Sequence, residues 1–263
     1  MPTPPTLQLI PLPDIPLVQP GDHLGQLIAA SLKRRTRATG DTVLADADIL
    51  VITSKIVSKA EGRYVNLVSI HPSPQAVALG RRTNKDPRLV EIILWDTVDV
   101  VRAFPNALIV RHRLGFVSAN GGVDSSNVDF PDRQRVLRLP EDPDRSAREI
   151  RFWLQESLGA SPAVIISDSH GRPWREGTVG VAIGLAGMKA SQDLRQQPDL
   201  FGRRLLITIV GLADQVAAAA SLVSGQGAEG VPVVLVRDLV YERAEETSAR
   251  DILRPPEQDL FRS

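Results

Sequence analysis

The chain has 263 residues, with 31 basic and 31 acidic side chains, so its formal net charge is zero at pH 7. This balance excludes a global field that would attract nucleic acid or an anionic membrane, and the basic run Lys33-Arg34-Arg35 fits the end of a helix. The absence of cysteine excludes disulfides, thiolate metal sites and cysteine nucleophiles, so we expect a cytoplasmic protein.

The length suits one unit, and we predict that residues 1–263 form a single unit with two interleaved lobes. Residues 1–20 contain seven prolines and should be extended, with an edge strand possible at Ile10-Pro11-Leu12. No signal peptide is predicted. Residues 254–263, which include Pro255-Pro256, are expected to form a mobile tail.

A helix and a buried strand are predicted next along the chain. Apolar residues at helical spacing follow Asp22, the predicted N-cap, and indicate a helix to about Arg35. Residues 49–52 are apolar and predict a buried strand. Ser54, Lys55 and Lys59 come directly after it, and both phosphate contact and a solvated turn are compatible with them.

The middle of the chain combines helical patterns with a glycine-marked polar loop. Residues 73–96 predict two helices separated at Asp86-Pro87, with Trp95 facing inward, and strands follow at 98–104 and 107–117. In the loop at 118–129, Asp124 and Asn127 offer oxygen donors suited to Mg²⁺ or Mn²⁺. A long hairpin loop would have the same composition.

Residues 142–159 predict the clearest helix of the chain, and a buried strand follows at 163–166. We expect this strand to end at Asp168, followed by a loop containing Gly171 and Pro173. Asp168 and Ser169 would then lie at the carboxyl end of a strand, where open sheets tend to leave ligand crevices. An ordinary capped turn explains the same residues.

The last third of the chain excludes two common nucleotide folds. Residues 205–223 approach the ~20 residues that span a bilayer, but Asp214 divides them, so we predict a strand at 205–210 and a helix at 214–223. The segment 224–230 matches G-x-G-x-x-G, yet it precedes a strand rather than a helix. We therefore predict an α+β fold of mixed β-sheets with flanking helices that is neither a Rossmann nor a P-loop fold.

The candidate ligands are oxygen donors and lysines on three segments that follow predicted strands. This donor set points to Mg²⁺ or Mn²⁺ carrying a phosphorylated substrate. The residues alone therefore predict a metal-dependent phosphoryl-transfer or nucleotide-using enzyme.

Five sequence blocks, in order and covering nearly the whole chain, resemble the coenzyme F420-0:L-glutamate ligase family. They are residues 16–22, 54–62, 121–128, 167–175 and 225–237. The resemblance implies a homodimeric, GTP-dependent ligase of the peptide synthase type. Such an enzyme joins L-glutamate to the deazaflavin coenzyme F420-0 through an acyl phosphate and releases GDP and phosphate.

The resemblance also implies roles for individual residues. Lys59 and Asp168 would act in catalysis. The nucleotide contacts would be Ile15, Pro16, Leu17, Val18, Ser54, Lys55, Lys59 and Asn127, and the metal ligands would be Asp124, Asp168, Ser169 and Gln226.

One residue departs from the pattern of the family. Family members commonly carry Asp-Thr-Phe-Gly where this chain has Asp168-Ser169-His170-Gly171. Serine keeps the hydroxyl ligand, whereas His170 places a polar ring near the substrate. The alternative prediction is therefore a metal- and nucleotide-binding relative that ligates an amino acid to another carboxylate or is not catalytic.

Overall fold

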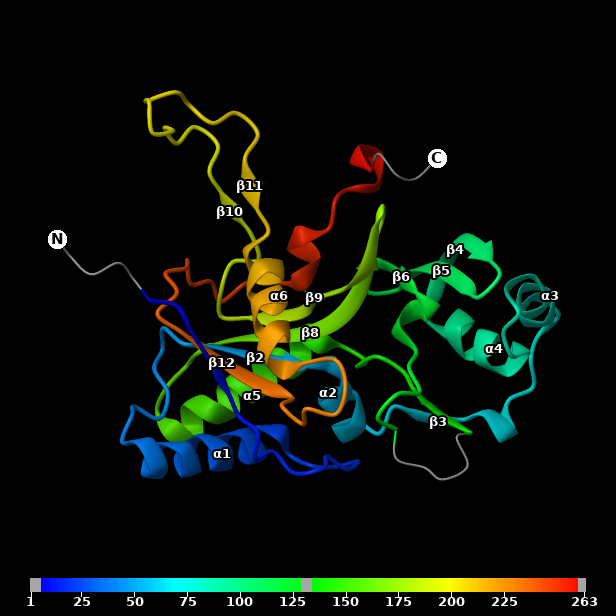
Figure 1. The fold of residues 1–263 in the computed structure, drawn as a ribbon, viewed down its shortest axis with the longest axis horizontal. Helices are drawn as coiled ribbons and strands as arrows, with labels where there is room; N and C mark the ends of the chain where they lie inside the picture. Colours follow the sequence, from blue (N-terminus) through cyan, green and yellow to red (C-terminus); the bar gives the residue numbers. More distant parts are fainter. Residues whose placement is uncertain (1–5, 129–133, 260–263) are drawn as a thin grey trace.

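The computed structural model describes residues 6–128 and 134–259, and it shows a mixed α+β fold with several open sheets (Figure 1). The predicted fold class is confirmed. Parts of the predicted proline-rich start and of the predicted tail lie outside the described residues.

A five-stranded sheet forms the centre of the molecule, in the order β1-β12-β2-β8-β9. β2 and β8 run parallel, and the other neighbours are antiparallel. The inner strands are apolar on both faces because helices cover both. The strands are β1 (Gln8–Pro11), β2 (Ile49–Thr53), β8 (Ala163–Arg172), β9 (Arg175–Ala186) and β12 (Val233–Arg237).

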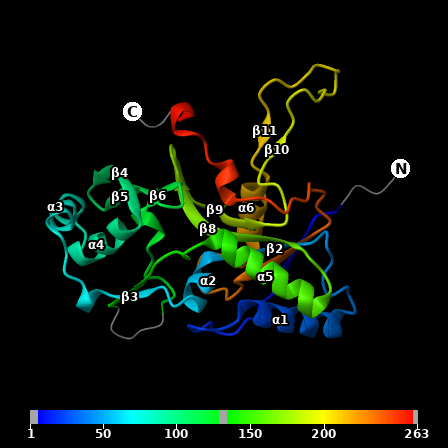
Figure 2. The same cartoon turned by 180° about the vertical axis from the view of Figure 1, so that it is seen from behind.

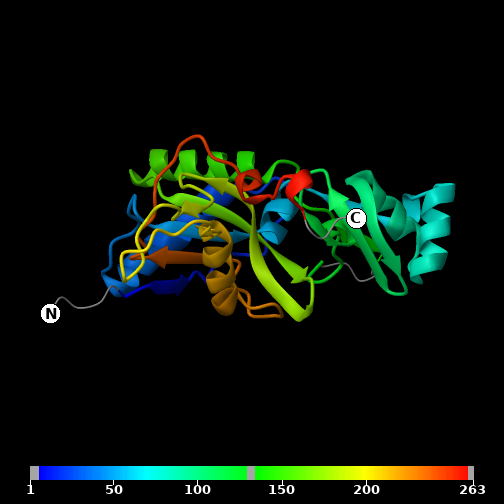
Figure 3. The ribbon, with the colours of Figure 1, turned by 90° about the horizontal axis from the view of Figure 1, so that it is seen from above.

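Helices α1 (Leu24–Thr39) and α5 (Pro143–Leu158) cover one face of the sheet, and α6 (Leu212–Ser224) covers the other (Figure 3). Two hydrophobic clusters result, one on each face. On the α1 and α5 face, Ile28, Leu32 and Leu154 are fully buried. The short helix α2 (Ser54–Ala60) follows β2 directly.

A smaller region made from residues 64–137 lies at one end of the molecule (Figures 1 and 2). Its three-stranded sheet packs on two helices, and a two-stranded sheet connects it to the centre. The elements are β3 (Tyr64–Asn66), η1 (Leu67–Ser69), α3 (Pro74–Thr83), α4 (Pro87–Trp95), β4 (Thr97–Phe104), β5 (Ala107–His112), β6 (Val117–Ala119), η2 (Asn120–Gly122) and β7 (Arg135–Leu137).

A narrow arm projects from the central sheet (Figure 1). It contains β10 (Gln192–Asp193) and β11 (Ile209–Val210), which pair with each other. The predicted strand at 205–210 is therefore wrong except for its last two residues, whereas the predicted helix at 214–223 matches α6. After β12 the chain ends in the short helices η3 (Ala249–Ile252) and η4 (Pro256–Gln258).

Asp168 does not end its strand, contrary to the prediction. β8 continues to Arg172 and turns back at Pro173 and Trp174 into β9, so that Asp168 pairs with Val181 inside a long hairpin. Trp174 adopts the left-handed conformation (φ 63°), as the second central residue of a type II turn does when proline is the first. The polar sequence suggested a loop because residues 171–178, around the turn of this hairpin, are mostly exposed.

Smaller differences concern the ends of elements. The N-cap of α1 is His23 rather than Asp22, which instead accepts from the backbone N–H of Gln19. The helix continues past Arg35, the predicted end, to Thr39, and Arg35 pairs with Asp41 at 2.6 Å.

Three further predictions in the first half of the chain need correction. Trp95 is 47% exposed, because it lies at the last position of α4, where the helix leaves the core. The predicted strand at 107–117 is two strands, β5 and β6. The segment after β2 forms a helix rather than a turn.

None of the helices in residues 6–128 and 134–259 combines the length and the hydropathy that a membrane span needs.

The contact between β9 and the start of α5 leaves no room for a side chain at Gly184. A β-carbon at this position would lie 2.5 Å from the carbonyl carbon of Pro143. We predict that Gly184→Ala lowers the free energy of unfolding by ~1–3 kcal/mol, the usual cost of overpacking. Urea titration measures it. Gly171→Ala on the neighbouring strand is the matched control, because a β-carbon there meets nothing within 4 Å; an equal loss in both variants would contradict the packing argument.

Candidate functional site

A cavity of about 760 Å³ opens where the central sheet meets the smaller region. Six separate stretches of the chain line it, and every residue that the sequence predicted for the site is among the lining residues. These are Ile15, Pro16, Leu17, Val18, Ser54, Lys55, Lys59, Asp124, Asn127, Asp168, Ser169 and Gln226. The structure therefore brings the predicted set together in one place.

The parallel pairing of β2 and β8 sets the first half of the site. Thr53 is paired with Ser167 in the register. Ser54 follows Thr53 and Asp168 follows Ser167, so these two residues are neighbours. The hydroxyl of Ser54 donates to Asp168 Oδ1 at 2.8 Å. Ser54 is buried, and this bond fixes the orientation of the Asp168 carboxylate.

The lysines of α2 reach across to the loop at 123–128. Lys55 Nζ lies 2.7 Å from Asp124 Oδ2 and also donates to the carbonyl of Ser126 at 2.9 Å. Lys59 Nζ donates to the carbonyl of Asn127 at 2.8 Å. These bonds join the central sheet to the smaller region and place two cations at the cavity wall.

Asp124 is the carboxylate on which these contacts centre. Burial alone would raise its pKa, but hydrogen bonds from Lys55 and Ser126 and the charge of Lys55 outweigh burial, and the net pKa lies below the ordinary value. The backbone of Asp124 is held by two hydrogen bonds with Leu137 of β7. The carboxylate is therefore ionised and its position is fixed.

The loop after α6 closes a third side of the cavity. Ser169 Oγ donates to Gln226 Oε1 at 2.7 Å, and Asn127 Nδ2 donates to the carbonyl of Gly227 at 3.1 Å. The helix can approach this closely because residue 180 of β9 is glycine: a β-carbon there would lie 2.5 Å from the carbonyl oxygen of Ala217. Asp168 accepts from Ser54 and Ser169 donates to Gln226, and both residues line the cavity.

The N-terminal segment at 15–18 forms the last wall. Ile15 and Val18 are buried in the core, whereas Pro16 and Leu17 are exposed. The segment is anchored close to α2 by the backbone hydrogen bond from Gly21 to Ala60 at 2.8 Å. It thus presents an extended backbone to the cavity.

The donor set suits a hard divalent cation. The described part of the chain holds no group of three or more His, Cys, Asp and Glu side chains that could bind a metal. A cation here would depend on the carboxylates of Asp124 and Asp168, with the oxygens of Ser169 and Gln226. These are the oxygen ligands that Mg²⁺ and Mn²⁺ prefer, and substrate oxygens complete such sites.

Behind Asp168 lies a stack of rings that sequence reasoning missed. His170 is 9% exposed, and its Nε2 lies 3.1 Å from Asp168 Oδ2. Its ring packs on Phe116 with centroids 4.8 Å apart, and Phe116 stacks on His112 at 5.1 Å. Only His170 carried a signal in the sequence, because the stack joins His112 of β5, Phe116 of the turn between β5 and β6, and His170 of β8.

His112 ends this stack at a buried ion cluster. Asp96 bonds Arg113 and Arg138, and these arginines lower its pKa although burial acts to raise it. Burial lowers the pKa of His112 to about 4, with Asp96 opposing that shift and the two arginines adding to it. His112 is therefore neutral at pH 7.

Similar proteins match almost the whole chain. The family described as F420-0:Gamma-glutamyl ligase matches residues 14–238. The chain is 48% identical over 261 residues to the coenzyme F420:L-glutamate ligase of Methanopyrus kandleri, covering 98% of each protein. It is 45% identical over 257 residues to the protein of the same name from Methanothermobacter thermautotrophicus, covering 97% of this chain and 99% of the relative.

The neutral state of His112 predicts a dependence of stability on pH. In the unfolded chain His112 binds a proton below pH 6.5, whereas in the folded chain it does so only below about pH 4. The free energy of unfolding should therefore fall as the pH drops through this range. In His112→Asn, whose amide can still accept from the N–H of Leu114, this part of the loss should disappear. Urea unfolding at several pH values measures it, and identical slopes in both proteins would refute the assignment.

Proposed function

Because the chain belongs to the F420-0:gamma-glutamyl ligase family, we propose that it adds L-glutamate to coenzyme F420-0 in a GTP-dependent reaction. It is a ligase, and both the family description and the names of its relatives carry this activity. The observation that supports the GTP-dependent form is the convergence of Lys55, Lys59, Asp124 and Asp168 on one cavity.

The lysines are the groups that would meet the phosphates of GTP. Lys55 now neutralises Asp124 at 2.7 Å, and Lys59 lies one helical turn further along α2. If Asp124 held a divalent cation, the ammonium of Lys55 would be free to bind a phosphate oxygen. Both lysines can then offset the charge of the transferring phosphoryl group.

Asp124 and Asp168 would hold Mg²⁺ or Mn²⁺, with Ser169 and Gln226 as further ligands. A bound cation would supply positive charge that offsets the negative charge of the phosphate groups. Ser54 orients Asp168 for this role through its 2.8 Å hydrogen bond, and His170 lies against the second carboxylate oxygen.

The proposed reaction proceeds in two transfers. A carboxylate oxygen of the coenzyme attacks the terminal phosphorus of GTP, the bond to the bridging oxygen breaks, and GDP leaves. The amine of glutamate then attacks the acyl carbon, phosphate leaves, and the amine loses a proton as the amide forms. Residues 15–18 and 225–231 line the cavity, and their closure over the bound substrates would keep water away from the acyl phosphate.

We also propose that the chain acts as a homodimer, because the arm carries apolar side chains that this chain does not cover. Leu200 is 99% exposed, Phe201 90% and Ile207 88%. Exposed apolar clusters of this kind mark interaction surfaces. A second copy of the chain, which carries the same arm, is the occupant that fits a symmetric contact.

A second candidate, a ligase for another carboxylate substrate, is favoured by His170 alone. Its ring lies beside Asp168, where the family commonly has phenylalanine, and a changed polarity near the acceptor would alter which carboxylate is taken. The reaction chemistry would be the same.

Replacing Asp168 tests the proposed function. Asp168→Asn should reduce GTP-dependent glutamate addition by more than about 100-fold, because even outer partners of metal sites cost ~10–100-fold. The assay incubates the protein with GTP, Mn²⁺, glutamate and F420-0 and reads the mass of the coenzyme. Asp238→Asn is the control, since Asp238 is an exposed carboxylate at φ 67°, where asparagine is tolerated.

The outcomes separate the candidates. No glutamate mass with the unaltered protein excludes the first candidate, and GDP release with a different acceptor favours the second. Full turnover by Asp168→Asn at saturating Mn²⁺ would show that the reaction does not need the carboxylate of Asp168.

The arm predicts the oligomeric state. Phe201→Asp should weaken the dimer by about 30-fold or more, the loss of a ~2 kcal/mol anchor residue. Sedimentation analysis at several protein concentrations measures this, with Phe104→Asp, at the other end of the molecule, as control. An unaltered protein that sediments as a monomer, or a Phe201→Asp variant that dimerises normally, would contradict the proposal.

A further inference from the structure

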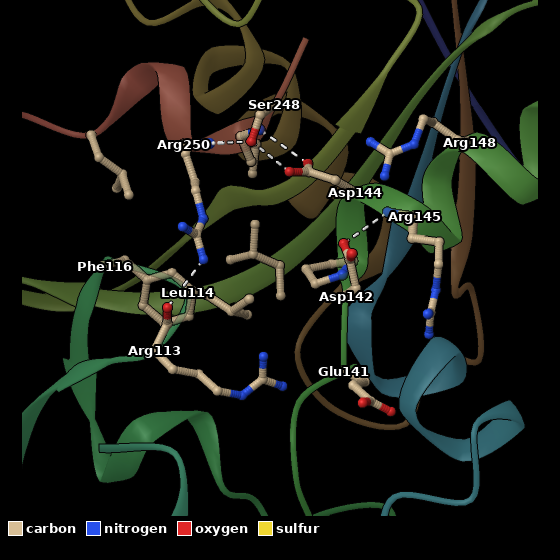
Figure 4. A pocket seen from close by; sticks show the side chains of 15 residues that line it. Arg113, Leu114, Phe116, Glu141, Asp142, Asp144, Arg145, Arg148, Ser248 and Arg250 are labelled. Atoms are coloured by element: carbon tan, nitrogen blue, oxygen red, sulfur yellow. Dashed lines mark hydrogen bonds between the residues drawn. The ribbon is translucent and has the colours of Figure 1, made fainter. Parts of the chain in front are cut away.

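A second cavity, of about 500 Å³, lies between η3, β9 and the first turns of α5 (Figure 4). It shares no lining residue with the cavity described above. Phe116 belongs to its wall and contacts His170, so the ring stack separates the two cavities. Four arginines line it: Arg113, Arg145, Arg148 and Arg250.

The acidic residues of this cavity are largely engaged by other donors. The carboxylate of Asp144 accepts from the N–H groups of Leu185 at 2.7 Å and Ala249 at 3.0 Å, and from the hydroxyl of Ser248 at 2.5 Å. Asp142 caps α5 by accepting from the N–H of Arg145 at 2.9 Å. Among the lining acids, the carboxylate of Glu141 alone has no such bond to the described residues.

The arginines do not pair with these acids within the described residues. Arg113 Nε binds Asp96, outside the cavity, and Arg250 Nη2 donates to the carbonyl of Arg113 at 3.2 Å. The guanidinium of Arg148 makes no hydrogen bond or ion pair with any residue that the structure describes. Figure 4 shows Arg113, Arg148 and Arg250 approaching the same space from three sides. Their remaining N–H groups are available to a ligand.

The rest of the wall is apolar. Leu114, Phe116, Ile183 and Leu253 face the same space. Ligand pockets commonly combine such a surface with a few polar groups, and volumes of roughly 300–1,000 Å³ are usual for them. The cavity thus offers an apolar surface beside a group of guanidinium donors.

We propose that this second cavity binds a small organic anion whose phosphate or carboxylate groups bond Arg148 and Arg250 and whose carbon body packs on Phe116 and Leu253. Guanidinium groups match both kinds of anion in bidentate geometry. The N-terminus of α5 adds a favourable dipole, since this helix is 16 residues long. The site is additional to the ligase reaction and does not depend on the nucleotide or metal assigned to the first cavity.

Calorimetric titration of the full chain with phenyl phosphate and with phenylsuccinate tests the site. The two compounds distinguish a phosphate ligand from a carboxylate ligand. Inorganic phosphate is titrated as the control that lacks an apolar group. We expect one of the two aromatic anions to bind at a single site and more tightly than inorganic phosphate. Arg148→Ala should weaken that binding by about 10-fold, the loss expected for one charge-assisted hydrogen bond. Arg148 is exposed and unpaired among the described residues, so the variant should fold.

Two control variants locate the bound anion. Arg82→Ala removes an exposed arginine of α3, far from the cavity, and should leave the affinity unchanged. Lys59→Ala alters the first cavity and should leave it unchanged as well. Absence of binding at millimolar concentrations, binding that Arg148→Ala leaves intact, or binding that only Lys59→Ala removes would each overturn the proposal. Equal affinity for phenyl phosphate and inorganic phosphate would show that the apolar wall does not contribute to binding.

Discussion

The parallel register between β2 and β8 is the constraint on which the site depends. With Thr53 opposite Ser167, the residues that leave β2 enter α2 directly beside the middle of β8. Ser54 then reaches Asp168, and Lys55 is directed away from the sheet toward Asp124. A shift of one residue in this register would turn Asp168 to the other face of the sheet and place it against α6. The fully buried, β-branched residues of both strands make such a shift costly.

The lysines and the glycines contribute to the rest of the site in different ways. Lys55 and Lys59 hold the loop at 123–128 by side-chain bonds that a ligand can replace. Gly180 and Gly184 set permanent distances, because α6 and α5 contact the backbone of β9 where a β-carbon would collide. The site therefore combines a rigid floor on the sheet with a side wall held by exchangeable ionic contacts.

The sequence predicted many of the residues that line the first cavity, but it predicted less well which elements hold them. Oxygen donors and lysines after apolar runs were visible as local patterns, so the polar residues of the first cavity could be chosen, and the resemblance added Gln226 and residues 15–18. Asp168 was placed at a strand end because polarity at 168–176 reads as a loop, whereas the register of β8 with β9 depends on residues further along the chain. Of the ring stack, only His170 carried a signal, since the stack joins two strands and a turn through contacts that no local spacing encodes.

The smaller region is built from one continuous insertion, residues 64–137, between α2 and α5, yet it supplies Asp124 and Asn127 to a cavity whose other walls belong to the central sheet. A molecule in which this insertion has opened, while the sheet stays folded, has lost the site. Ligand occupancy and closure of the insertion are therefore thermodynamically linked, and every ligand that bridges the two regions suppresses this local opening. Amide hydrogens of β3 and β7, which connect the insertion to the sheet, would report this linkage as slower exchange, although no ligand touches them.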